Sequence, residues 1–395
     1  MVNIQNLSPA IFWLGVNDLE TKLFESLWPI PNGISYNSYF IVDDKNVLID
    51  TVKEPYIDLF LDRLNQLTNG KGRIDYLVIN HIEPDHSGAI KLLKRIFPEI
   101  TIIGNSKTKD LLQKFYKLDE IMIVDDGDTL KLGKHKLKFV LTPMVHWPET
   151  MMTLEEQTGT LFSGDVFGGF GGLSGSIFQD QQKEFYQENE TSRYFTNVIA
   201  KYSIMVEKAL AKIATLAINQ LAPAHGPVWR KDISRIIDLY GHLCRQESKK
   251  GAVIVYASMY GNTKLLAEEI ASGFSENSQN PVKLYDISKT HMSYILNDVW
   301  QYEGLILGGC TYNTELFPLL KDFLALIANK PLTNRKLGIF SSHSWNGGAE
   351  KDLLAYASAS KLQLIEPVIT LVGAPGKEDF EVARNLGKNV ALALR

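Results

Sequence analysis

The chain has few cysteines, and neither of its two is placed for a disulfide framework or a thiolate metal site. Cys244 and Cys310 lie in segments that we assign to different domains, and the sequence contains no Cys-x-x-Cys pair. Disulfide-dense scaffolds, thiolate zinc sites and a rubredoxin-type iron centre within this chain are therefore excluded. The low cysteine usage also leads us to expect a reducing, cytoplasmic environment.

Long apolar runs and an excess of positive charge are also lacking. No apolar run approaches the roughly 20 residues that span a bilayer, so we expect no membrane segment. Residues 1–10 lack the basic and apolar regions of a signal peptide. The formal net charge is −4 with both signs interspersed, which excludes a basic stripe for nucleic acid. What remains is an ordinary globular composition, 45% apolar and 22% charged, over 395 residues, which is enough for two domains.

The pattern of expected secondary structure changes near residue 250, and this predicts a domain boundary. Residues 1–249 show short strand-like runs separated by Gly, Pro, Asp and helical patterns, which predicts an α+β or layered αββα domain. Residues 250–395 alternate strands and helices regularly, after a polar linker at 245–251. The strands expected there are 252–256, 282–285, 304–307, 336–340 and 368–371. Five such βα units predict a doubly wound parallel five-stranded sheet.

The most informative segment, at residues 80–87, reads Asn-His-Ile-Glu-Pro-Asp-His-Ser. It follows an apolar run at 74–79 that predicts a buried strand. Its potential metal ligands are His81, Glu83, Asp85 and His86. If the segment stays extended, His81, Glu83 and Asp85 share one side of the chain. Imidazoles and carboxylates at a strand end predict a site for metal ions that prefer nitrogen and oxygen ligands.

Three later residues occupy a similar context, namely His146, Asp165 and His225. Each follows an expected strand at a point where Gly or Pro interrupts the pattern. Taken alone, a histidine there is more often a structural residue, and Asp165 is typical of a turn. Beside the first cluster, however, each of them fits a remaining ligand position.

In order and flanking residues, this set resembles the metallo-β-lactamase-like fold. The usual pattern there is His-x-His-x-Asp-His, whereas Glu83 marks the variant found in flavodiiron proteins (A-type flavoproteins). The resemblance extends to His-Trp-Pro-Glu-Thr-Met at 146–151, Ser-Gly-Asp at 163–165 and Pro-Ala-His-Gly at 223–226. It implies one iron held by His81, Glu83 and His146, a second held by Asp85, His86 and His225, and Asp165 as the bridge. Independently, three carboxylates among four imidazoles form an anionic set that favours ferric iron over zinc.

Residues around this set are candidates for a supporting role. The resemblance places Tyr194 beside the iron pocket, although a core or surface aromatic residue explains it equally well. Asp50, at the end of an expected strand, is a candidate for orienting a ligand histidine.

A second signal opens the C-terminal part, where a strand runs into Ala-Ser-Met-Tyr-Gly-Asn-Thr at 257–263 and then a helix. Such a turn at a helix N-terminus offers free N–H groups and a positive dipole end to a phosphate, although it can also simply cap the helix. Neither a Walker motif nor Gly-x-Gly-x-x-Gly is present in this turn. The turn is similar to the phosphate loop of flavodoxins, which bind FMN.

Two further loops follow the third and fourth expected strands and lie at the carboxyl edge of the sheet, where ligands bind. Cys310, in the first of them, reads as a small packing residue. The FMN contacts that we expect from the three loops are Ser258, Met259, Tyr260, Gly261, Asn262, Thr263, Thr311, Tyr312, Asn313, Ser344, Trp345, Asn346, Gly347 and Gly348.

The resemblance implies an oxidoreductase in which FMN passes electrons to a non-haem di-iron site that reduces dioxygen to water, nitric oxide to nitrous oxide, or both. It also implies a head-to-tail homodimer or a dimer of dimers. The donor is open between rubredoxin, a reduced deazaflavin coenzyme and an NAD(P)H-dependent reductase, and the sequence does not select the oxidant. Two alternatives remain. One is a zinc hydrolase of the same fold joined to a flavodoxin-like electron carrier, and the other is an electron carrier with a vestigial metal site.

Overall fold

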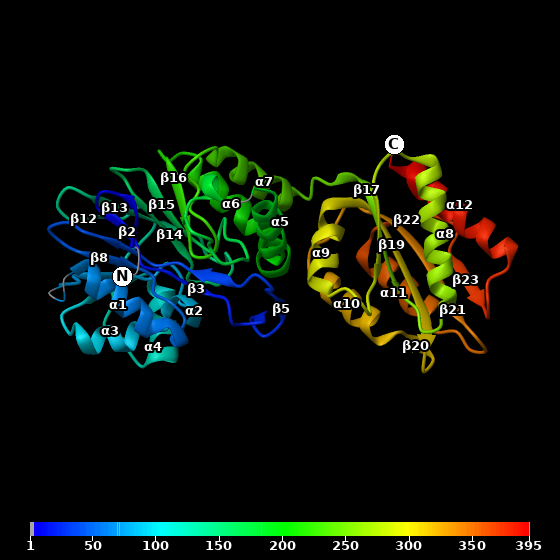
Figure 1. Cartoon of the computed structure of the whole chain (residues 1–395), viewed down its shortest axis with the longest axis horizontal. Helices are drawn as coiled ribbons and strands as arrows, with labels where there is room; N and C mark the ends of the chain where they lie inside the picture. The colour runs from blue at the N-terminus through cyan, green and yellow to red at the C-terminus, as the bar shows by residue number, and fades with distance from the viewer. Residues whose placement is uncertain (1–3, 69, 71, 183, 395) are drawn as a thin grey trace. The chain divides into compact units, whose positions relative to one another are not determined.

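The computed structural model describes residues 4–68, 70, 72–182 and 184–394. The chain divides into two compact units, Met1–Cys244 and Arg245–Arg395 (Figure 1). The two units share no sheet in the described part of the chain, and each has its own hydrophobic core. Among the described residues, no helix is long and apolar enough to cross a membrane.

The first unit is built on two sheets that face each other across one core. The larger sheet has the order β1 (Gln5–Ser8), β2 (Ile11–Trp13), β7 (Tyr39–Ile41), β8 (Val47–Ile49), β9 (Tyr76–Val78), β10 (Thr101–Gly104) and β11 (Met122–Ile123). The smaller has the order β12 (Thr129–Lys131), β13 (Lys136–Leu141), β14 (Met151–Glu155), β15 (Thr160–Gly164) and β16 (Gln220–Pro223). Side chains from both sheets, such as Val78 and Phe162, share a single buried cluster, as expected for two packed sheets.

Helices cover the outer faces of these sheets. One set, drawn in blue to cyan, is α1 (Ile57–Thr68), α3 (Ile90–Ile96) and α4 (Ser106–Tyr116); the other, in green, is α5 (Glu184–Tyr194), α6 (Ser203–Ile213) and α7 (Ile233–Arg245) (Figure 1). Several of these helices turn an apolar stripe inward, as α1 does with Phe60 and Leu64. The αββα layering predicted from the sequence is therefore confirmed.

Short elements complete the first unit. They are the strand pairs β3 (Val16–Asp18) with β6 (Ile34–Tyr36) and β4 (Leu23–Phe24) with β5 (Trp28–Pro29), the helical turns η1 (Glu54–Tyr56), α2 (Pro84–Ser87), η2 (Gln179–Gln181) and η4 (Ala200–Tyr202), and the π-helix η3 (Phe195–Ile199). The strand pairs have only two or three residues per strand, too few to show a repeating pattern in the sequence.

The second unit is a doubly wound parallel sheet, as predicted, but the described sheet has seven strands where five were expected. Its order is β18 (Val282–Asp286), β17 (Lys249–Ala257), β19 (Tyr302–Tyr312) and β21 (Lys336–His343), with β22 (Gln363–Leu364) and β23 (Ile369–Val372) both beside β21 and β20 (Glu315–Leu316) beside β19. The difference arises because the short strands β20 and β22 join the sheet. The helices are α8 (Asn262–Asn277), α9 (Met292–Gln301), α10 (Pro318–Ala328), α11 (Ala349–Ser360) and α12 (Lys377–Ala393). In Figure 1, α8 and α12 lie on one side of this sheet and α9 and α10 on the other.

Helices α8 and α12 approach each other closely enough for their backbones to touch. A Cβ atom added to Gly273 would lie 2.1 Å from the carbonyl oxygen of Arg384, and one added to Gly387 would lie 2.0 Å from that of Ile270. Both positions therefore require glycine, because any side chain would push the helices apart.

Candidate functional site

The first cluster of potential ligands begins just beyond β9 and does not stay extended. Glu83 precedes α2, and Pro84 occupies the first turn of that short helix, where proline is favoured. Asp85 and His86 therefore lie on a helical turn. The prediction that His81, Glu83 and Asp85 share one side of an extended segment was wrong for Asp85, because the turn at Pro84 redirects its side chain.

The structure brings all seven predicted ligand positions into two groups. The groups, each with its potential ligand atoms within 4.8 Å of one another, are His81, Glu83, His146 and Asp165, and Asp85, His86 and His225. In the first group, Glu83 Oε2 lies 3.0 Å from His81 Nε2 and 3.2 Å from His146 Nε2. In the second, His225 Nε2 and His86 Nε2 each lie 3.4 Å from an oxygen of Asp85.

Asp165 connects the two groups through its two carboxylate oxygens. Its Oδ2 lies 3.2 Å from His146 Nε2 and 3.4 Å from His81 Nε2. Its Oδ1 lies 3.1 Å from His86 Nε2 and 3.5 Å from His225 Nε2. A carboxylate in this position can bridge two cations, one in each group.

Strand ends explain how residues far apart in the sequence meet here. Asp165 directly follows β15, and His225 comes two residues after β16. These strands are parallel neighbours, so their carboxyl ends lie at the same edge of the sheet. His146 lies in the connection between β13 and β14, and Met151 at the start of β14 donates its N–H to the carbonyl of Asn80, 3.0 Å away. That bond joins the His146 connection to the first cluster.

The arrangement fits buried cations. Among the described residues, both oxygens of Asp85, Oδ2 of Asp165 and Nε2 of His225 have no hydrogen-bond partner, although all are buried. Buried polar atoms without partners are costly, and a metal ion would satisfy these atoms together. The residues present therefore fit a pair of metal ions with nitrogen and oxygen ligands.

The charges lead to the same conclusion. Burial opposes protonation of His146, but the carboxylates of Asp165 and Glu83 outweigh it and raise its pKa to about 9. For His86, burial is likewise outweighed by Asp85 and Asp165, and its pKa is raised to about 9. Although burial raises the pKa of Asp165, His86 and His146 pull it well below its usual value. Without another cation these carboxylates hold protons on the imidazoles, which shows how strongly the site attracts positive charge.

Aromatic rings enclose the second group. The ring centroids of Phe24, Tyr36 and Tyr194 lie 5.4, 5.6 and 5.5 Å from that of His225. Tyr194 is fully buried, and its hydroxyl has no hydrogen-bond partner among the described residues. The structure therefore places the ring of Tyr194 beside His225 of the ligand cluster.

The supporting carboxylate is not the one that the sequence suggested. Asp50 Oδ1 accepts the backbone N–H groups of Asn80, at 2.8 Å, and His81, at 3.4 Å, so its hydrogen bonds within the described part of the chain go to the main chain. Glu149 instead lies 2.6 Å from Nδ1 of His81. Sequence reasoning missed Glu149, although it lies in the segment His-Trp-Pro-Glu-Thr-Met at 146–151, which carries part of the resemblance.

In the second unit, the turn between β17 and α8 forms part of a shallow hollow. Gly261 precedes α8 with a φ of +97°, and its N–H donates to Ser258 Oγ at 3.1 Å. The hollow has a volume of about 60 Å³ and is lined by Ser258, Met259, Tyr260, Asn262, Thr263, Cys310, Thr311, Ser342, His343, Ser344 and Gly373. A glycine in the left-handed region at a helix N-terminus leaves backbone N–H groups open to a phosphate.

The expected FMN contacts divide into those inside the hollow and those around it. The lining includes residues from all three predicted loops, and four of its members were not expected as FMN contacts, namely Cys310, Ser342, His343 and Gly373. Gly261, Tyr312, Asn313, Trp345, Asn346, Gly347 and Gly348 were expected but do not line the hollow. Tyr260 and Trp345 are 91% and 92% exposed, so both rings are free to cover a flat ligand. Burial raises the pKa of the Cys310 thiol, consistent with a packing role.

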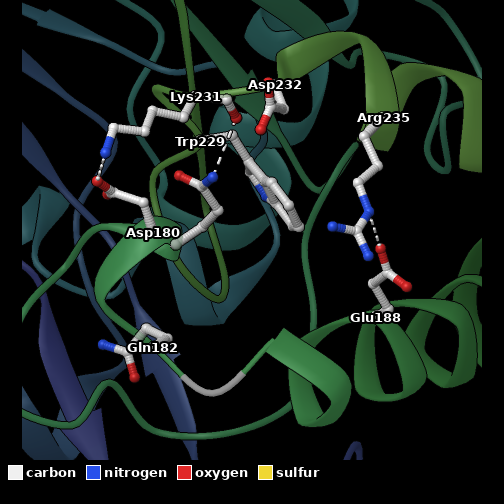
Figure 2. Close-up of a pocket in the computed structure, with 8 residues that line it drawn as sticks. Asp180, Gln182, Glu188, Trp229, Lys231, Asp232 and Arg235 are labelled. Atoms are coloured by element: carbon white, nitrogen blue, oxygen red, sulfur yellow. Dashed lines mark hydrogen bonds and ion pairs between the residues drawn. The ribbon is translucent and has the colours of Figure 1, made fainter.

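A separate hollow of about 220 Å³ lies in the first unit (Figure 2). Its lining is Gln179, Asp180, Gln182, Glu188, Trp229, Lys231, Asp232 and Arg235. Asp180 pairs with Lys231 at 3.1 Å, and Glu188 pairs with Arg235. None of the predicted site residues lines it, so we assign it no part in the chemistry of the ligand cluster.

Comparisons with known proteins cover both units. Residues 34–226 match the family described as ODP family beta lactamase, and residues 254–386 match flavodoxin. A nitric oxide reductase of Moorella thermoacetica is 32% identical over 394 residues, which cover 98% of this chain and 97% of that protein. An anaerobic nitric oxide reductase flavorubredoxin of Escherichia coli is 30% identical over 388 residues, which cover 96% of this chain and 80% of the relative.

Solved structures share the fold over nearly the whole chain. The rubredoxin oxygen:oxidoreductase of Desulfovibrio gigas has a TM-score of 0.95 at 26% identity, covering 99% of this chain and 98% of that one. The flavodiiron protein of Giardia intestinalis has a TM-score of 0.95 at 27% identity, covering 100% of this chain and 98% of that one.

Proposed function

Because the chain belongs to the flavodiiron protein family, we propose that it is an oxidoreductase in which FMN passes electrons to a non-haem di-iron site that reduces dioxygen to water, nitric oxide to nitrous oxide, or both. The observation that carries the proposal is the gathering of seven nitrogen- and oxygen-bearing side chains into two adjoining groups connected by Asp165. We assign residues 1–249 to the di-iron function and residues 250–395 to FMN binding.

The proposed ligands follow the two groups. His81, Glu83 and His146 would hold one iron, Asp85, His86 and His225 the other, and Asp165 both. The distances within each group and the unpartnered atoms of Asp85, Asp165 and His225 support this assignment. When bound, the iron pair supplies open coordination positions for a small gas, and FMN supplies electrons.

The chain's own residues prepare the site for this chemistry. Glu83, Asp85 and Asp165 offset the charge of bound cations, and the rings of Phe24 and Tyr36 exclude water from the side of His225. Burial, with a further contribution from Asp165 and Asp85, raises the pKa of Tyr194 well above its usual value. The phenol therefore stays protonated and can donate a hydrogen bond into the pocket.

For FMN, we propose that the phosphate lies against residues 258–263 and that the ring system lies between the loops at 311–313 and 344–348. The left-handed Gly261 at the start of α8 and the exposed rings of Tyr260 and Trp345 support this placement. Ser258 and Thr263 would add hydroxyl donors to the backbone N–H groups.

The remaining assignments concern partners. A rubredoxin-type donor agrees with the printed name of the Desulfovibrio gigas relative, and a reduced deazaflavin coenzyme or an NAD(P)H-dependent reductase would serve the same flavin. We also propose a head-to-tail homodimer or dimer of dimers, in the cytoplasm.

The test combines metal analysis with turnover. Purified protein is assayed for iron, zinc and flavin, and steady-state rates are measured with dioxygen and with nitric oxide, using reduced rubredoxin and a reduced deazaflavin in parallel. Iron, FMN and turnover with either gas are expected. Zinc in place of iron together with esterase turnover would overturn the proposal, as would reduced protein that neither gas reoxidises.

A further inference from the structure

Glu149 makes a short contact with a potential iron ligand from outside the ligand set. Its Oε1 lies 2.6 Å from Nδ1 of His81 and accepts the backbone N–H of Ile82 at 3.0 Å. Both side chains are almost fully buried, at 0% exposure for Glu149 and 1% for His81. If Nδ1 of His81 donates its proton to this carboxylate, the other ring nitrogen, Nε2, which faces Glu83 and Asp165, is left to bind a cation.

The surrounding structure holds Glu149 in place. Its carbonyl oxygen accepts from Nδ2 of Asn105 at 2.6 Å, and Asn105 is itself fixed as the N-cap of α4. The carboxylate is therefore anchored from its own main chain while it contacts His81.

The connection between β13 and β14 thus acts on both histidines of the first group. It carries His146 directly, it places the ring of Trp147 with its centroid 5.2 Å from that of His81, and it supplies Glu149. A substitution at Glu149 should therefore alter the orientation of the His81 ring. The same substitution leaves His146 in place, because His146 is part of the connection itself.

The other group lacks an equivalent carboxylate contact in the described part of the chain. Nδ1 of His225 lies 2.8 Å from the backbone carbonyl of Ser35, and Nδ1 of His86 has no hydrogen-bond partner. Orientation by a buried carboxylate is thus specific to the group that contains His81.

We propose that Glu149 is the positioning residue of the first metal position, fixing the tautomer and ring orientation of His81 so that Nε2 faces the metal. The inference rests on the proposed function, in which His81 is a ligand. Carboxylates that orient a metal-bound histidine typically contribute about 10- to 100-fold to metal affinity.

The chain offers a matched control in Glu155, at the far end of β14. Glu155 is also 0% exposed, and its Oε1 lies 3.0 Å from Nδ1 of a histidine, His135, that belongs to neither metal group. Glu149 lies just before β14 and Glu155 is its last residue, so replacing either glutamate removes a buried carboxylate at one end of the same strand. Only Glu149 contacts a proposed ligand.

The experiment measures how fast the reduced holoenzyme releases metal to a ferrous chelator. The unfolding temperature of each protein is measured in parallel. The variants are Glu149→Ala, Glu149→Gln, Glu155→Ala and Glu155→Gln. We expect release from Glu149→Ala to be about 10- to 100-fold faster than from the native protein. Glu149→Gln keeps an acceptor of the same shape, so we expect it to restore most of the native retention. Both Glu155 variants should release metal at the native rate even where their unfolding temperature falls.

Several results would overturn the inference. These are an unchanged release rate in Glu149→Ala, equal acceleration in the Glu155 variants, or a Glu149→Gln rate as fast as that of Glu149→Ala. If Glu149→Ala does not fold, ¹⁵N NMR of zinc-loaded Glu149→Gln decides. A His81 Nδ1–H that is still bonded, together with native retention, supports the inference, whereas native retention after loss of that bond overturns it. Native protein that holds zinc instead of iron would refute the proposed function but leave this comparison intact.

Discussion

Nε2 of His86 lies 3.1 Å from Oδ1 of Asp165, and both side chains are buried. The other oxygen of the same carboxylate faces His146 and His81. One side chain therefore belongs to both halves of the proposed metal centre. Its replacement should lower the metal content at both positions, which no other single substitution in the set is expected to do.

Asp165→Asn should lower the metal content at both positions. The amide keeps the size of the side chain but loses the charge and one acceptor oxygen. We expect loss of most of the iron and at least a 100-fold fall in gas reduction, with FMN content unchanged. Elemental analysis and flavin absorbance measure this. Asp180→Asn, which removes a carboxylate paired with Arg230 and Lys231 at the other hollow, serves as the control and should keep its iron.

Glu83→Ala should affect the first metal position more than the second. Glu83 contacts His81 and His146 but is not part of the group formed by Asp85, His86 and His225. We expect about half of the iron to be lost, with a larger loss of activity, as measured by iron content and Mössbauer spectroscopy. Full iron content together with full activity would refute a ligand role for Glu83.

Gly261→Ala should weaken FMN binding through the backbone. A Cβ atom at Gly261 would meet nothing within 4 Å, so the cost comes from the left-handed φ of +97°, about 1–2 kcal/mol. Relaxation of the turn would misalign its N–H groups, and we expect FMN affinity to fall about tenfold. Fluorescence titration of apoprotein with FMN measures the change.

Gly127→Ala is the control for that experiment. Gly127 has a φ of +90°, also with nothing within 4 Å of an added Cβ, but it lies in the first unit. It should carry a similar backbone cost and leave FMN affinity unchanged. Equal affinities for both variants would show that the turn at Gly261 does not bind the phosphate.

Glu155→Gln should make stability less dependent on pH. Burial raises the pKa of Glu155, but hydrogen bonds from the Thr158 side chain, the N–H groups of Thr158 and Gln157, and His135 outweigh it, so its pKa is lowered from the ordinary 4.5. A lowered pKa in the folded state stabilises the protein above the unfolded pKa, and this contribution is lost as the pH falls through the folded one.

The native protein should therefore exceed Glu155→Gln in stability by about 1–3 kcal/mol at neutral pH. The difference should shrink as the pH falls below about 4.5. Thermal unfolding of both proteins across this range tests the sign. A difference that stays constant with pH would show that the carboxylate charge is not involved.

Regular elements were predictable where the sequence carries a clear period or a strong boundary residue. Helix α10 carries both signals, because Pro318 marks its first turn and its apolar residues recur at helical spacing. The strand expected in the apolar run at 74–79 is β9. The hairpin of β4 and β5 was not predicted, because strands of two residues carry no period and are held by tertiary packing, as Phe24 is against His225.

The site was predictable in its membership and less so in its geometry. Order and flanking residues pointed to the seven side chains that gather in the structure, and their role as iron ligands stays a prediction. The division of His81 and Asp85 between groups depends on the turn at Pro84, and the contact of Glu149 with His81 depends on the pairing of Met151 with Asn80. Such long-range contacts leave no periodic trace in a sequence.

The glycine contact between α8 and α12 has a consequence for biosynthesis. Leu386 and Val390 of α12 belong to the same buried cluster as Ile270 of α8, and Gly387 allows the two helix backbones to approach closely. The flavodoxin-like unit therefore cannot close its interior until α12 has left the ribosome, whereas the first unit is complete by Cys244. During translation, the unit that receives the metal can be finished well before the unit that receives the flavin.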